Sequence, residues 1–99
     1  MKHRIQNIRQ HEETLDKAEA LLTDLKSVAE EWQQLFPAYV KLIDYYQSPQ
    51  WIEDYESSNK GQFPSLKCGV LSQDAVYNLI SKVREVSILL MKAGIKGIE

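Results

Sequence analysis

The stretch YYQSPQWIEDYESSNKGQFPSLKCGVLSQDAVYNLI, residues 45–80, decides the fold because it separates two long helical patterns. Ser48 can cap a helix and Pro49 suits the first helical position, which predicts a short helix over about 49–57. The run SSNKG then ends that helix. The following QFPSLKCGVL has proline, glycine and no periodicity, which predicts an ordered loop over about 58–71. We therefore interpret this stretch mainly as a corner that reverses the chain.

The first half of the chain has the heptad pattern of a long amphipathic helix. Apolar residues recur in alternating steps of three and four, with His11 in one place of the series, and they line one stripe: Ile8, Leu15, Ala18, Leu22, Leu25, Ala29, Trp32, Phe36, Tyr39, Ile43 and Tyr46. Pro37 removes one backbone hydrogen bond but does not shift the phase. We expect a helix over about 2–47 with a kink near residue 37. The alternative is a break, with Pro37 in the first turn of a second helix.

The end of the chain predicts another helix over about 72–93. Ser72 is a good N-cap, and Asp74 in the first turn favours the positive end of the helix dipole. Gly94 is the expected C-terminal stop, which leaves residues 94–99 as a loose tail. The sequence thus predicts one all-α domain over 1–99, a helical bundle or hairpin.

Composition and charge exclude several classes of function. The net charge is −2, so no overall positive field attracts nucleic acid. The longest apolar run, Ile88 to Met91, is far too short to span a bilayer. The lone Cys68 cannot form an internal disulfide, and no apolar signal core follows MKHR. We expect a cytoplasmic protein that binds neither nucleic acid nor membrane.

The lengths of the two long helices differ, and this difference predicts self-association. A helix of roughly 45 residues is about 65 Å long, whereas one of roughly 20 residues is about 30 Å long. The last helix cannot cover the whole stripe of the first, and Ile88 to Met91 is apolar on all sides. We therefore expect a homodimer that uses Ile8, Leu15, Leu22, Ile88, Leu89 and Met91. The alternative is a compact monomeric bundle in which Pro37 breaks the first helix.

Acidic residues on the first helix suggest one enzymatic alternative. Glu12, Asp16 and Glu19 share a helical face, with Glu13 adjacent. All-α nucleotide pyrophosphatases bind magnesium with such clusters, facing a second acidic helix. That second half is missing here, and hard cations need several converging oxygen ligands. A solvated acidic face is the favoured interpretation, and a metal-dependent hydrolase is the alternative.

The histidines and the cysteine do not form a recognisable catalytic or metal motif. His3 and His11 are eight residues apart, whereas a helical metal pair normally stands at i and i+4. Lys67 and the following helix could lower the pKa of Cys68, but no histidine lies near it in sequence to act as a base. We expect no catalytic residue, no metal and no cofactor.

The corner supplies the best candidate for contact with another protein. We name as the acidic–aromatic cluster the residues Tyr45, Tyr46, Trp51, Asp54, Tyr55 and Glu56. Flat aromatic surface with an acidic rim is typical of a protein-binding hot spot. The structural interpretation is that Trp51 and Tyr46 belong to the core and fix the short helix. The two interpretations are compatible.

The corner also resembles a small bacterial family described as a domain of unknown function, DUF4298. The similar motifs are Y-Y-x-S-x-x-W-x-x-D-Y-E, a glycine-proline linker and R-G-V-L-S-E-D-A-V-Y. This chain departs from them at Cys68, where the family pattern has arginine, and at Gln73, where it has glutamate. If that arginine pairs with an acid such as Asp54 in relatives, the pairing is absent here. The resemblance implies an all-α fold and a bacterial cytoplasmic origin, and it supplies no activity.

Taken together, these patterns predict a small non-enzymatic helical protein. We expect it to act by self-association and by contact with a protein partner that the sequence does not identify.

Overall fold

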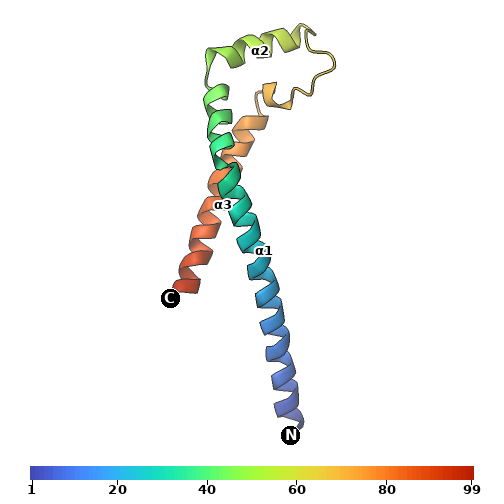
Figure 1. The fold of residues 1–99 in the computed structure, drawn as a ribbon, viewed down its shortest axis with the longest axis vertical. Helices are drawn as coiled ribbons and strands as arrows, with labels where there is room; N and C mark the ends of the chain where they lie inside the picture. Colours follow the sequence, from blue (N-terminus) through green and yellow to red (C-terminus); the bar gives the residue numbers. More distant parts are fainter. The chain divides into compact units, whose positions relative to one another are not determined.

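The computed structural model describes residues 1–99, and its regular structure is helical throughout (Figure 1). The elements are α1 (Lys2–Tyr46), α2 (Pro49–Asn59), the short 3-10 helix η1 (Gly69–Leu71) and α3 (Ala75–Ile98). The prediction of an all-α fold with a long first helix, a short middle helix and a C-terminal helix is confirmed. No helix has a segment that is both long enough and apolar enough to span a bilayer. The chain divides into two compact units, Met1–Val40 and Lys41–Glu99.

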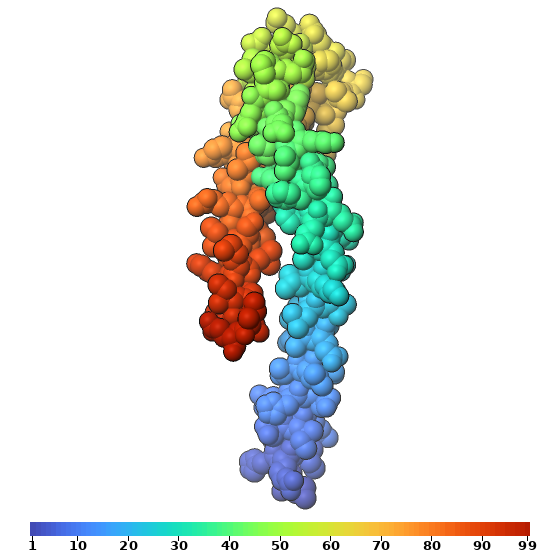
Figure 2. Space-filling view, turned by 60° about the vertical axis from the view of Figure 1, so that its left-hand side comes forward, coloured from blue at the N-terminus to red at the C-terminus, as the bar shows by residue number.

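The first unit is the greater part of a single helix. α1 runs through Pro37 without ending there, so no second helix begins at this proline. Thr14 and Thr23 lie inside the helix and donate their hydroxyl protons to the carbonyls four residues back, at 3.2 and 2.8 Å. Figure 2 shows the residues of this unit, from blue to green, as a single rod. Because the unit holds no second element, it has no buried core of its own.

The second unit begins with the last turn of α1, and α2 starts directly after it. Ser48 is the N-cap with extended backbone, and its hydroxyl oxygen accepts a long hydrogen bond from the Trp51 amide at 3.4 Å. Pro49 occupies the first helical position, where its missing N–H is no loss. The Ser48 hydroxyl also donates to the carbonyl of Tyr45 at 2.6 Å. One side chain thus ends α1 and starts α2.

The end of α2 depends on one glycine. Gly61 has a φ of 76°, the left-handed conformation that glycine adopts without a steric penalty. Its amide donates to the Ser58 carbonyl at 3.0 Å, and the Gln62 amide donates to the Ser57 carbonyl at 3.1 Å. These two bonds form a Schellman motif, which satisfies the last free carbonyls of the helix. The chain then leaves α2 and returns through η1 to the start of α3 (Figure 1).

The buried residues of the chain are Leu71, at the end of η1, and Val76, in the first turn of α3, which are 8% and 3% exposed. Phe63 in the preceding loop is half-buried, while Leu66 and Val70 are exposed. Of the four apolar residues in this loop, Leu71 is therefore the one that anchors the chain most firmly.

The bounds of α3 differ from the sequence prediction at both ends. The helix begins at Ala75, after Asp74. Ser72 still serves the helix, because its hydroxyl oxygen accepts the Ala75 amide at 3.0 Å. At the other end, α3 continues past Gly94 to Ile98, so residues 94–98 are helical and do not form a loose tail. A glycine inside a helix costs only about 1 kcal/mol relative to alanine, and this one does not take the left-handed conformation that ends a helix.

Candidate functional site: the acidic–aromatic corner

The acidic–aromatic cluster lies within the second unit, where the last turn of α1 meets α2. The Tyr45 hydroxyl donates to one carboxylate oxygen of Asp54 at 2.5 Å. The Gln50 side-chain amide donates to the other carboxylate oxygen at 2.9 Å. Gln50 and Asp54 are four residues apart on α2 and therefore share one face of that helix. Asp54 is thus held by one donor from each helix.

These hydrogen bonds change the protonation of both partners. The pKa of Asp54 is lowered, because the Tyr45 hydroxyl and then the Gln50 amide donate to its ionised form. The pKa of Tyr45 is raised to about 12, first because its hydroxyl is bonded to Asp54. Partial burial, the charge of Asp54 and the charge of Cys68 raise it further. At neutral pH the pair is therefore a neutral phenol bonded to a carboxylate.

Two aromatic residues fix the corner through backbone carbonyls. The Trp51 indole N–H donates to the Val70 carbonyl at 2.9 Å, which joins α2 to η1. The Tyr46 hydroxyl donates to the Gln73 carbonyl at 3.2 Å, which joins the end of α1 to the turn before α3. Both side chains therefore hold the returning chain in place, although both are half-buried and the buried residues are Leu71 and Val76.

The aromatic rings of the cluster also contact one another. Tyr46 and Trp51 meet edge to face, with ring centroids 5.2 Å apart and planes at 73°. Trp51 and Tyr55 are stacked at 5.2 Å with planes at 13°. Offset and perpendicular pairs at such distances stabilise by about 0.5–1.5 kcal/mol beyond the area they bury. Trp51 is thus the central residue of the corner.

The exposed part of the cluster is acidic. Glu56 is exposed, and Glu53 and Asp44 are further exposed acids of the same unit. The side chains of Tyr45, Tyr46, Trp51 and Asp54 already use polar atoms for bonds within the chain. Contact of this cluster with a partner protein stays a prediction from the sequence.

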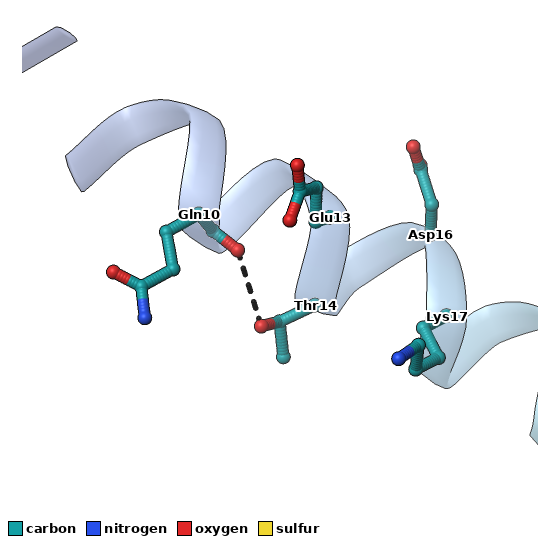
Figure 3. A pocket seen from close by; sticks show the side chains of 5 residues that line it. All are labelled: Gln10, Glu13, Thr14, Asp16 and Lys17. Carbon is teal, nitrogen blue, oxygen red and sulfur yellow. Dashed lines mark hydrogen bonds between the residues drawn. The ribbon is translucent and has the colours of Figure 1, made fainter. Parts of the chain in front are cut away.

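The acidic face of α1 is a solvated helix surface. A shallow hollow on it is lined by Gln10, Glu13, Thr14, Asp16 and Lys17, all from the one helix (Figure 3). Glu13 and Asp16 lie on one side of the helix in this view, and Lys17 lies on the other side with Thr14. Across the whole chain, no three His, Cys, Asp or Glu side chains converge so that they could hold a metal ion. Glu12, Glu13, Asp16 and Glu19, the candidate ligands of the metal-dependent hydrolase, therefore do not form such a group.

Cys68 lies in the loop just before η1, and both histidines lie on α1. The Cys68 thiol is half-buried and donates to the Leu66 carbonyl at 3.4 Å. His3 and His11 are exposed on α1.

The apolar residues that the sequence predicts for self-association are exposed. On α1, Ile8, Leu15 and Leu22 are 61%, 51% and 64% exposed. On α3, Ile88, Leu89 and Met91 are 40%, 63% and 67% exposed. Each group lies on a helical surface that its own unit leaves open to water.

Sequence reasoning missed three groups that complete the corner. Gln50 could have been found, because a glutamine four residues before an aspartate on a helix is a known stabilising pair. The acceptors for Trp51 and Tyr46 are the backbone carbonyls of Val70 and Gln73. Every residue has such a carbonyl, so residue type gives no signal for them.

One family model matches residues 8–93, and its description is "Domain of unknown function (DUF4298)". The match includes the whole corner and most of both long helices. It confirms the family that the resemblance of residues 45–77 indicates. Neither a curated protein nor a solved structure matches the chain.

Proposed function

We propose that this chain, which belongs to the DUF4298 family and so to a family without an assigned activity, is a non-enzymatic cytoplasmic protein that self-associates. The observation that carries the proposal is the open stripe of α1. Within its own unit, α1 has no other element to cover Ile8, Leu15 and Leu22, and each is more than half exposed. A second copy of the chain offers the same stripe, which is the simplest way to cover it.

The apolar surface of the stripe contributes a free energy of the same order as the cost of association. Covering an Ile or Leu that is about half exposed contributes roughly 1 kcal/mol. Adding Leu25, also exposed, gives four such residues in each copy. Together they provide on the order of 8 kcal/mol, similar to the cost of about 4–15 kcal/mol for bringing two chains together. Covering the aromatic residues farther along the stripe would contribute further favourable free energy.

The terminal helix offers a second apolar surface. Ile88 and Met91 are three residues apart on α3 and share one face, whereas Leu89 points about 100° away from Ile88 around the helix. One neighbouring helix could not cover them all. This distribution supports a contact with more than one element.

Light scattering coupled to size-exclusion chromatography tests the proposal. We expect a dimer at tens of micromolar, and a monomer throughout a concentration series would contradict it. Leu22→Asp should dissociate the dimer, because it puts a charge into the covered stripe. Leu66→Asp is a matched control, since Leu66 has the same 64% exposure but lies in the loop of the second unit. This control should remain a dimer.

A further inference from the structure

We infer that two copies pair antiparallel along α1, with Leu22 of one copy opposite Leu25 of the other and Glu19 beside Lys26 on the flank. This inference rests on the proposed self-association and adds its orientation and register. It uses residues of the first unit alone, where α1 is one unbroken helix.

The unbroken helix lets heptad positions be assigned throughout the unit. With Ile8 at position a, the a residues are Ile8, Leu15, Leu22, Ala29 and Phe36, and the d residues are His11, Ala18, Leu25, Trp32 and Tyr39. The e residues, on one flank, are Glu12, Glu19, Lys26 and Gln33, with Ile5 and Val40 at the two ends of the unit. The g residues, on the other flank, are Thr14, Leu21, Val28 and Leu35, after Asn7 near the N-terminus. Between Ile8 and Tyr39 one flank is therefore polar and charged, and the other is mostly apolar.

This asymmetry of the flanks selects the antiparallel orientation. In a parallel pair, e residues of one helix lie beside g residues of the other, so Lys26 would face Leu21 and Glu19 would face Thr14. In an antiparallel pair, the two e flanks meet each other and so do the two g flanks. Charges then meet charges, and Leu21 meets Val28. The parallel pair would also set Arg4 of one copy against Arg4 of the other at a core position.

The charges on the e flank then select one register. When Leu22 is opposite Leu25, Glu19 of each copy lies beside Lys26 of the other, and the twofold symmetry gives this ion pair twice. A shift by one heptad in one direction keeps two ion pairs, between Glu12 and Lys26, but sets Glu19 against Glu19. A shift in the other direction sets Lys26 against Lys26. The intermediate register avoids both repulsions.

The core layers of this register are complementary in size. Trp32 lies opposite Leu15, and the next layer toward the centre pairs Ala18 with Ala29, which gives the large indole room. Ile8 lies opposite Tyr39. The rings of Trp32, Phe36 and Tyr39 contact one another at centroid distances of 5.5–5.9 Å, so they form one ordered aromatic surface at that end. The aliphatic start of one stripe therefore meets the aromatic end of the other.

The apolar flank provides independent support. Leu21 and Val28 are apolar and yet 62% and 60% exposed. They lie at g positions, so a contact that uses only the a and d residues would leave them in water. In the proposed register, Leu21 of each copy lies within about 3 Å along the axis of Val28 of the other. The same pairing therefore covers apolar surface on one flank and joins opposite charges on the other.

Charge reversal tests the register. Glu19→Lys and Lys26→Glu should each lower the dimer association constant about tenfold, because each turns two attractive pairs into repulsive ones. The double variant should return to within about threefold of the wild type. Glu13→Lys is the matched control, because Glu13 is exposed on the outer face and the charge changes by the same amount. It should leave the association constant unchanged. Sedimentation equilibrium measures all four variants.

Distances measured between spin labels on the two copies provide a direct test of the same register. In a Cys68→Ser background, a label at Glu13→Cys should lie about 32 Å along the axis from its symmetry mate, and a label at Ser27→Cys about 10 Å. A register shifted by one heptad changes each separation by about 10 Å, and a parallel pair makes both axial offsets zero.

The outcomes separate the two proposals. A wild-type monomer overturns self-association and the register together. A wild-type dimer overturns the register alone if the double charge variant fails to recover, or if the label distances fit a parallel or shifted pair. Recovery of the double variant with the expected label distances supports both proposals.

Discussion

The Tyr45 hydroxyl lies 2.5 Å from a carboxylate oxygen of Asp54, so a phenol from the last turn of α1 is bonded to an acid in the middle of α2. This contact joins the end of α1 to α2 within the corner. It also shifts the two pKa values in opposite directions, and it therefore gives the folded second unit a characteristic response to pH.

Alkaline titration should detect this bond through Tyr45. Its pKa is about 12 in the folded chain against about 10 when unfolded. The stabilisation is therefore fully present below pH 10 and is lost as pH rises from about 10 to 12. We expect the ultraviolet absorbance of phenolate to show a late step that Tyr45→Phe removes. If Tyr45→Phe leaves the late step in place, this assignment is wrong.

The stability of the folded chain at acid pH should depend on Asp54. Its folded pKa lies below the ordinary value, so its contribution is present above about pH 4 and is lost as pH falls through the lowered value. Asp54→Asn should thus be less stable than the wild type at pH 7, and the difference should shrink toward pH 2. Urea denaturation at the two pH values measures this. Glu56→Gln, which changes an exposed acid, should show no such trend.

Trp51 should contribute more to stability than Tyr46. Trp51→Phe removes the hydrogen bond to Val70 and leaves a ring of different shape beside Tyr55, which we expect to cost about 1–2 kcal/mol. Tyr46→Phe keeps its ring and loses one exposed hydrogen bond, which should cost about 0.5 kcal/mol. Urea denaturation followed by circular dichroism compares them. The reverse order would contradict the central place of Trp51.

Two glycine-to-alanine substitutions should change the stability of the chain in opposite directions. Gly61→Ala places a Cβ on left-handed backbone and should destabilise by about 1 kcal/mol. Gly94→Ala lies inside α3, with no other atom within 4 Å of the added Cβ, and should stabilise by about 0.5–1 kcal/mol. Thermal unfolding of both variants gives the comparison. A destabilised Gly94→Ala would mean that the last turns of α3 are not helical.

The sequence predicted the elements more reliably than their ends. Ser48 and Pro49 mark the start of α2 because a cap and a first-turn proline are local features. Gly61 and Gly94 are the same residue type, yet one ends a helix and the other lies within one. The difference depends on whether the neighbouring carbonyls find other donors, and that is set by the surrounding fold.

The same limit applied to the candidate site. The aromatic residues and the acid could be named from the sequence because their side chains are distinctive. Their bonding partners could be foreseen only where they were side chains at helical spacing, as with Gln50. The carbonyls of Val70 and Gln73 became partners because the loop returns at that place.

The bond from Tyr46 to Gln73 spans 27 positions of the chain, and this has a kinetic consequence. Drawing together the ends of such a loop costs roughly 3 kcal/mol of chain entropy, which few other distant contacts help to offset. The helices can form first, within microseconds, because their bonds are local. The ring that this bond completes depends on a non-local contact, so it should open as a whole when the second unit fluctuates.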